Sequence, residues 1–223
     1  LARGATLRVM RQWDAAAALE ELRRTDVTST IMVPTMFRQI LALPAEVRGN
    51  AQPTSLRTVL HGGEPCPIQV KEAITGVLGD VLVEYYGFTE GGMAVVRRDE
   101  WRDHPGSVGR PLPGMEVRVL NDAGEPVPAG TDGTVYFQPT NGRMFRYQGD
   151  DAKTEGAHIG DAFTVGDIGR LDEDGFLYLS GRAADVVVSA GVNIYPAEID
   201  AALSDVPGVA DLAAVGAPDA ERG

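Results

Sequence analysis

Residues 57–87, RTVLHGGEPCPIQVKEAITGVLGDVLVEYYG, decide the fold of this chain. The runs 57–61 and 81–85 read as short strands, and the segment 68–78 between them reads as a helix. Strands joined through a helix pair in parallel, and the helices then cover the sheet. The stretch therefore predicts a parallel α/β sheet, in which ligands sit at the carboxyl ends of the strands.

The same alternation precedes this stretch. Asp14 is a good N-cap for an Ala- and Leu-rich helix over 15–24, and the run 27–33 is a strand rich in Val, Ile and Thr. Pro34 ends that strand and suits the first turn of a helix, so we expect a second helix over 35–43.

The sequence changes character after about residue 104. Gly, Pro and Asp now punctuate short apolar runs, a pattern typical of hairpins and barrels. These runs lie at 116–120, 134–138 and 176–180. Past residue 181 we expect the strand, helix and strand of a smaller α+β unit, at 186–189, 196–203 and 209–215. The predicted fold class is α/β, with a parallel sheet and flanking helices, a β-rich, barrel-like part, and the start of a small α+β domain.

Composition excludes several classes of function. The 223 residues are 43% hydrophobic and 23% charged, which is typical of a globular protein with a sizeable core. A net charge of -12 argues against nucleic acid or anionic lipid as a partner. Cys66 is the single cysteine, so no disulfide forms within the chain. No apolar run reaches the roughly 18 residues of a membrane span, and we predict a cytoplasmic location.

Four short motifs carry candidate chemistry. HGGEP at 61–65 follows a strand, and its glycines let the backbone approach a planar ring, although a Gly-Gly turn alone is an ordinary connection. YYGFTEGG at 85–92 offers an aromatic face, a hydroxyl donor and the Glu90 carboxylate, which suits Mg²⁺ held against phosphate oxygens. The alternative is that the tyrosines belong to the core and that Glu90 is a solvated surface charge.

The other two motifs lie further along the chain. In VGDIG at 165–169, Asp167 stands beside a glycine and suits a ribose diol. In GRAAD at 181–185, Arg182 suits a ribose or a phosphate, and the segment NIYPAEI follows at 193–199. Each motif taken alone is also common in plain turns.

The order of these motifs resembles the adenylate-forming superfamily, which contains acyl-CoA synthetases, luciferases and the adenylation domains of peptide synthetases. That family carries Tyr-Gly-x-Thr-Glu, Thr-Gly-Asp and Gly-Arg-x-x-Asp segments in this order. Here they appear as YGFTE at 86–90, VGD at 165–167 and GRAAD at 181–185. The resemblance implies three regions: part of a large α/β AMP-binding domain over 1–105, its β-rich subdomain over 106–182, and the beginning of a mobile C-terminal domain over 183–223.

The resemblance also implies residue roles. Those expected at the nucleotide are Gly63, Glu64 and Pro65 around the adenine, Tyr86 beside the base, Gly87, Asp167 at the ribose hydroxyls and Arg182 as a second contact. Thr89 would contact phosphate as a catalytic residue, and Glu90 would be both catalytic and the Mg²⁺ ligand. Those expected to wall the acid pocket are Gly62, Gly87, Gly91 and Gly92. Gly191 would line a channel for the pantetheine arm of CoA.

The implied function is an ATP- and Mg²⁺-dependent ligase that activates a hydrophobic carboxylic acid, such as a fatty acid, as acyl-adenylate and transfers it to CoA. The segment 193–199, and the absence of a proline before Thr89, favour CoA as acceptor. Two alternatives stay open: an adenylation domain that loads a carrier protein, and a noncatalytic nucleotide-binding protein. Fatty, aromatic and steroid side-chain acids all remain candidates.

Three features depart from the family pattern. The chain begins at Leu1 rather than Met, and the expected phosphate loop and C-terminal lysine lie outside it, so we expect an internal fragment that is inactive alone. At the hinge position, the family's acid or lysine is replaced by Ala184, and Asp185 follows.

The histidines show no metal-ligand spacing and read as turn or surface residues, with His61 as the one exception to watch; they are His61, His104 and His158.

Overall fold

The chain forms two compact units, Leu1–Val83 and Glu84–Gly223. The structure, a computed structural model, describes residues 4–24, 26–49, 52–189, 192–203, 206, 208–209 and 212–217. None of the helices in these ranges has the length and apolar character that a membrane crossing requires. The predicted domain boundaries near residues 105 and 182 stay predictions.

The first unit is the predicted α/β layer. Its elements are β1 (Ser29–Met32), β2 (Thr58–His61) and the helices α1 (Ala15–Arg23), α2 (Pro34–Leu41), α3 (Ala45–Arg48) and α4 (Ile68–Leu78). Strands β1 and β2 pair in parallel, with Thr30 opposite Val59. The Val59 N–H donates to the Val81 carbonyl at 2.8 Å, just before β3 (Leu82–Gly87). The expected strand-helix-strand unit is therefore confirmed.

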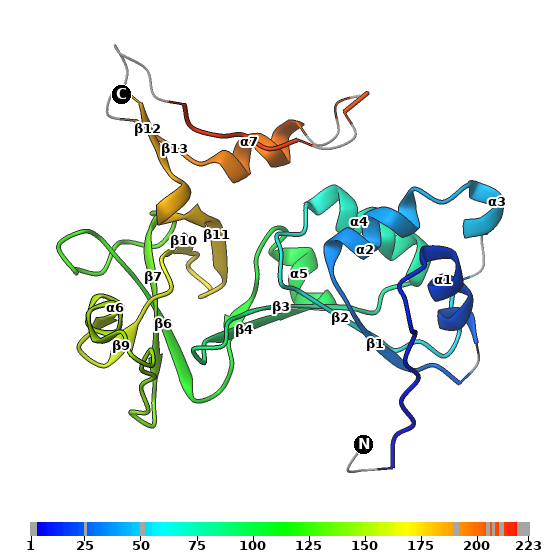
Figure 1. Ribbon diagram of the computed structural model, residues 1–223, viewed down its shortest axis with the longest axis horizontal. Coiled ribbons are helices and arrows are strands. Elements are labelled where there is room, and N and C mark those ends of the chain that lie inside the picture. Colours follow the sequence, from blue (N-terminus) through cyan, green and yellow to red (C-terminus); the bar gives the residue numbers. More distant parts are fainter. Residues whose placement is uncertain are drawn as a thin grey trace. The chain divides into compact units, whose positions relative to one another are not determined.

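Helices α1, α2 and α4 cover one side of β1 and β2 (Figure 1). A core cluster fills the space between them, because inward-facing apolar residues repeat on each element; its members include Leu19, Phe37, Ile40, Val59, Ile74 and Leu78. Each of these side chains is at most 1% exposed. The burial of these apolar side chains stabilises the helices, because isolated helices of this length are only marginally stable in water.

Two different caps start the first helices. Asp14 accepts a hydrogen bond from the Ala17 N–H at 2.8 Å, as predicted for α1. At α2, Pro34 takes the first turn, and Val33 at the cap position has no side-chain hydrogen bond. The carboxylate of Glu64 fills that place, because it accepts from both the N–H and the hydroxyl of Thr35. The HGGEP loop is thereby tied to the N-terminus of α2.

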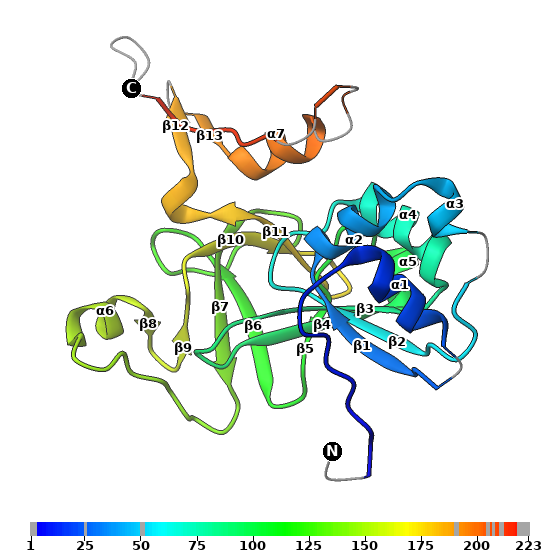
Figure 2. The same cartoon turned by 45° about the vertical axis from the view of Figure 1, so that its right-hand side comes forward.

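The second unit is rich in strands. Its sheet follows the order β11-β10-β7-β9-β8, with β6 also paired to β7 (Figure 2). These strands are β6 (Met115–Leu120), β7 (Gly133–Pro139), β8 (His158–Ile159), β9 (Ala162–Phe163), β10 (Asp167–Leu171) and β11 (Leu177–Arg182). Over the residues that the structure describes, the sheet stays open, so the barrel signals of the sequence correspond to antiparallel hairpins and not to a closed barrel.

Shorter elements complete this unit. They are β4 (Met93–Arg97), α5 (Arg98–Asp103), β5 (Arg110–Pro111), α6 (Asp151–Gly156), the 3₁₀ turn η1 (Ala183–Asp185), β12 (Val187–Ser189), β13 (Val192–Ile194) and α7 (Pro196–Leu203). The expected strand and helix at 186–189 and 196–203 are thus present. The strand expected over 209–215 is absent among the residues described there, because Val215 is 82% exposed and lies in irregular backbone.

Candidate functional site

Asp167 is the centre of the candidate site. It is 7% exposed, and its Oδ2 atom accepts a hydrogen bond from the Tyr86 hydroxyl. Its Oδ1 atom lies 3.3 Å from Nε of Arg182. Three of the four sequence motifs therefore meet at one carboxylate within the second unit.

The β10–β11 hairpin creates this meeting. Its antiparallel register sets Asp167 directly opposite Arg182, so Asp167 opens a strand and does not follow one. The register shifts between Ile168 and Gly169, where a Cβ atom on the glycine would overlap the Tyr178 carbonyl oxygen. The bulge therefore depends on glycine at position 169.

The electrostatics keep Tyr86 a donor. Burial raises the pKa of the Tyr86 phenol well above its usual range, and the hydrogen bond to Asp167 raises it further. The phenol is thus protonated at any physiological pH. Each oxygen of Asp167 has one protein partner and a second lone pair to offer, so the carboxylate still suits the two hydroxyls of a ribose. Arg182, with its side chain 69% exposed, lies beside this position.

Glu90 sits in the turn between β3 and β4. Two backbone hydrogen bonds close the turn, from Gly91 to Phe88 and from Phe88 to Gly92, at 3.1 and 3.2 Å. The Glu90 Oε1 atom accepts from the Tyr147 hydroxyl at 2.9 Å. Thr89 is exposed next to it. Nothing in the sequence pointed to Tyr147, which lies in an irregular stretch 57 residues away.

The turn suits a cation that is held mainly by phosphate. Within the described ranges there is no group of three or more His, Cys, Asp or Glu side chains that would enclose a metal ion. Mg²⁺ is commonly bound through one or two carboxylates, with water and substrate phosphates supplying the other ligands. A single half-buried carboxylate such as Glu90 fits that pattern.

Packing explains one of the glycines assigned to the acid pocket. A Cβ atom on Gly92 would overlap the Phe88 ring and lie 3.0 Å from Cγ of Phe137. Phe88 and Phe137 meet edge to face, with ring centroids 5.1 Å apart, in the core of the second unit. Gly91, by contrast, faces open space with φ at +117°. The acid-pocket roles of Gly62, Gly87, Gly91 and Gly92 stay predictions.

The remaining predicted residues belong to the first unit or lie outside the described residues. Gly63 has φ at +88°, which favours glycine, and it stands between β2 and the Glu64 cap. The carboxylate of Glu64 accepts hydrogen bonds from the first turn of α2 and also lies 3.5 Å from Nη2 of Arg38. The adenine roles of Gly63, Glu64 and Pro65 stay predictions. Gly191 lies outside the residues that the structure describes.

His61, the one histidine that the sequence set apart from a turn or surface role, is a core residue. It ends β2, is fully buried, and packs edge-on against Phe37 with ring centroids 5.2 Å apart. Neither ring nitrogen finds a hydrogen-bond partner among the described residues. Burial, with a smaller contribution from the Lys71 charge, lowers the pKa of His61 to about 3.

We expect this histidine to make the protein sensitive to acid. The unfolded imidazole binds a proton near pH 6.5 and the folded one only near pH 3, so folding stability falls as pH drops below about 6.5. At pH 5 the histidine lowers the free energy of unfolding by about 2 kcal/mol relative to neutral pH, and a His61→Phe variant should not show this loss. Urea unfolding of both proteins at pH 7.5 and pH 5 measures the difference. Equal pH dependence in the two proteins would contradict the assignment.

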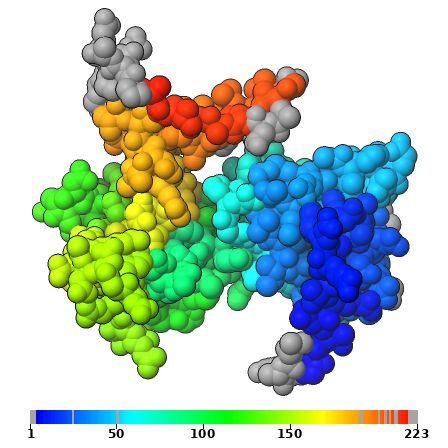
Figure 3. Space-filling view, viewed as in Figure 1, coloured from blue at the N-terminus to red at the C-terminus, as the bar shows by residue number. Residues whose placement is uncertain are grey.

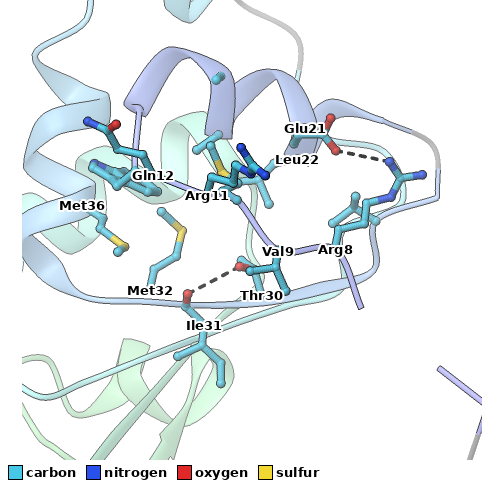
Figure 4. Close-up of a pocket in the computed structure, with 15 residues that line it drawn as sticks. Arg8, Val9, Arg11, Gln12, Glu21, Leu22, Thr30, Ile31, Met32 and Met36 are labelled. Atoms are coloured by element: carbon cyan, nitrogen blue, oxygen red, sulfur yellow. Dashed lines mark hydrogen bonds and ion pairs between the residues drawn. The ribbon is translucent and has the colours of Figure 1, made fainter. Parts of the chain in front are cut away.

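An open groove of about 900 Å³ lies elsewhere in the first unit. It runs between residues 8–13, helix α1 and strand β1, and Figure 4 shows Met32 and Met36 on one side of it, with the Arg8–Glu21 ion pair at its other end. In Figure 3 the start of the chain, in dark blue, lies along the surface of this unit. None of the predicted site residues lines the groove.

Comparison with known proteins places the chain in a family. The family model for AMP-binding enzymes matches residues 1–144. A fatty acid–[acyl-carrier-protein] ligase from Streptomyces coeruleorubidus is 34% identical over 99% of this chain and 43% of its own length. The chain thus spans less than half the length of such relatives.

Solved structures agree. The amide bond synthetase McbA from Marinactinospora thermotolerans matches with a TM-score of 0.84 and 31% identity, over 96% of this chain and 44% of that one. The o-succinylbenzoate CoA synthetase from Bacillus subtilis, solved with its acyl-adenylate intermediate, matches with a TM-score of 0.84 and 29% identity, over 96% and 43%. The mixed α/β fold predicted from the sequence is therefore confirmed, and the chain belongs to the AMP-binding enzyme family of adenylate-forming ligases.

Proposed function

We propose that this protein uses MgATP to activate a carboxylic acid as acyl-adenylate and then transfers the acyl group to the thiol of CoA. The observation that carries the proposal is the buried Asp167 carboxylate, which accepts a hydrogen bond from Tyr86 and forms an ion pair with Arg182. A buried carboxylate that is oriented by a hydrogen bond on one oxygen and an ion pair on the other is a preorganised acceptor for a ribose diol.

In the first step an oxygen of the substrate carboxylate attacks the α-phosphorus of ATP, and pyrophosphate leaves. This step needs charge neutralisation and in-line positioning more than a protein nucleophile. Glu90 would hold Mg²⁺ against the phosphates, Thr89 would contact a phosphate oxygen, and Arg182 would add positive charge. The Tyr86 ring would lie beside the adenine. Gly63, Glu64 and Pro65 are also proposed as adenine contacts, on the strength of the sequence resemblance alone.

In the second step the CoA thiol attacks the acyl carbonyl, its proton passes to solvent or a base, and AMP leaves. CoA is proposed over other acceptors because the segment 193–199 and the absence of a proline before Thr89 resemble acyl-CoA synthetases. The substrate is proposed to be a hydrophobic acid, and Gly91, where a Cβ atom would meet nothing within 4 Å, would leave room beside the Glu90 turn. Transfer of the acyl group to a carrier protein is the second candidate function, and it is favoured by the carrier-protein ligase among the relatives.

A product assay separates these candidates. The complete natural polypeptide is incubated with ATP, Mg²⁺ and a panel of fatty, aromatic and steroid side-chain acids, and with CoA, a phosphopantetheinylated carrier domain or a primary amine. Mass spectrometry of each mixture should find acyl-CoA from at least one acid. Acylated carrier or amide without acyl-CoA would replace the proposed acceptor. No AMP from any combination would favour a noncatalytic nucleotide-binding protein.

A further inference from the structure

One contact in the second unit joins the Glu90 turn to a distant loop. The hydroxyl of Tyr147 donates to Oε1 of Glu90 at 2.9 Å, across 57 residues of sequence. Glu90 is half-buried, and its own turn is closed by backbone hydrogen bonds that leave the side chain untouched. The phenol therefore fixes the carboxylate rotamer.

Tyr147 is itself held firmly. Its N–H donates to the Thr154 hydroxyl oxygen at 3.0 Å, and Thr154 is a buried residue of α6. Phe145 meets the Tyr147 ring edge to face, with centroids 4.9 Å apart. Nζ of Lys153 lies 4.2 Å over the ring face, where a cation is attracted by the π-electrons. The ring and the backbone of this tyrosine are thus both held by neighbouring residues.

Helix α6 supplies this support because of its N-cap. The Asp150 carboxylate accepts from the Lys153 N–H at 2.9 Å, which starts the helix, and the Asp150 carbonyl accepts from the Thr154 hydroxyl at 2.8 Å. The same hydroxyl oxygen that receives the Tyr147 N–H is thereby oriented by α6. Hydrogen bonds therefore connect Asp150 to Thr154, Thr154 to Tyr147, and Tyr147 to the Glu90 carboxylate.

We propose that Tyr147 is a positioning residue that holds Glu90 ready to bind the Mg²⁺ ion of MgATP. This inference rests on the proposed function. A phenol that occupies one lone pair of Oε1 leaves Oε2 and the second lone pair of Oε1 to the cation. Partners that orient a metal ligand contribute strongly, and their loss commonly weakens metal binding or activity by about 10- to 100-fold.

The test measures coupling between metal and nucleotide at equilibrium. In the complete natural polypeptide, calorimetry gives the Kd for ATP with excess Mg²⁺ and the Kd for ATP with a chelator. The Kd with chelator divided by the Kd with Mg²⁺ reports how much the cation strengthens ATP binding. In Tyr147→Phe we expect this ratio to fall about tenfold, with metal-free ATP binding unchanged. Thr154→Val, which keeps the phenol but removes the hydroxyl behind it, should lower the ratio in the same direction.

Two further variants identify the cause of any change. Tyr178→Phe removes a tyrosine–carboxylate hydrogen bond of 3.2 Å, to Asp172, elsewhere in the same unit, and it should leave the ratio unchanged. Glu90→Gln should lower the ratio at least as much as Tyr147→Phe. An unchanged ratio in Tyr147→Phe beside a lowered one in Glu90→Gln overturns the positioning role alone. An unchanged ratio in both variants overturns the metal role of Glu90 in the proposed function. Equal losses in Tyr147→Phe and Tyr178→Phe would overturn the inference, because they would indicate general loosening.

Discussion

Asp167→Ala should lower kcat/KM for ATP by about 30-fold or more in the complete polypeptide, a loss of about 2 kcal/mol. The carboxylate is 7% exposed, accepts a hydrogen bond from Tyr86 and forms an ion pair with Arg182. The charge-assisted hydrogen bonds that it would accept from the ribose hydroxyls contribute roughly 1.5–3 kcal/mol. Initial rates of pyrophosphate release at varied ATP concentration measure the effect.

A matched control isolates the nucleotide effect from a stability effect. Asp132 is another acidic residue of the second unit, and it accepts from the Ser180 hydroxyl at 2.9 Å and from Arg170 at 3.4 Å. Asp132→Ala should lower stability but leave kcat/KM for ATP within about twofold. If Asp167→Ala and Asp132→Ala behave alike in kinetics, Asp167 does not contact the nucleotide.

Gly92→Ala should destabilise the second unit by about 3 kcal/mol, near the upper end of what overpacking a core costs. The new methyl group would overlap Phe88 and crowd Phe137, so one of two packed rings must move. Displacement of Phe88 would also shift the turn that carries Glu90. Denaturant unfolding measures the change in the free energy of unfolding.

Gly156→Ala is the control for this substitution. Gly156 is the last residue of α6, in the same unit, and a Cβ atom there would meet nothing within 4 Å. We expect that variant to be as stable as the natural protein or slightly more stable, because alanine favours helix over glycine. Equal stability of Gly92→Ala and Gly156→Ala would show that the close approach to the rings is not real.

Much of the first unit could be predicted from sequence. Helix α4 covers Ile68–Leu78, the residues expected, because proline precedes it and glycine follows it. Asp14 caps α1 as predicted. In each case the signal is local, within one turn of the element that it sets. The Glu64 cap of α2 escaped notice because its donor, Thr35, lies 29 residues earlier in the chain.

Short polar helices escaped prediction for a different reason. The sequences RDEWRD of α5 and DAKTEG of α6 carry no apolar period, so nothing distinguished them from loops. Caps hold them in place: Asp150 accepts from the Lys153 N–H, and the Glu100 carboxylate accepts from the Arg97 N–H at 3.1 Å. The strand predicted at 209–215 is the opposite case. Its apolar residues suggested a strand, but those that the structure describes do not pair with any sheet.

The candidate site was predictable as a set of motifs but not as a geometry. Order along the chain pointed to Tyr86, Asp167 and Arg182. Their contact depends on the register of β10 against β11 and on a bulge at Gly169, which are tertiary properties. The bond from Tyr147 to Glu90 depends likewise on where α6 packs. Side chains brought together by strand register leave no periodic signal in the sequence.

Acid-dependent exchange of labelled pyrophosphate into ATP, with Mg²⁺ and without any thiol, tests directly whether the complete natural polypeptide forms an acyl-adenylate. Formation of an acyl-adenylate is reversible, so we expect label in ATP only when a suitable carboxylic acid is present, and we expect that label to be lost on chelation of Mg²⁺. Exchange that proceeds equally without acid, or no exchange with any acid of a broad panel, would contradict the assignment of this protein as an acid-activating ligase.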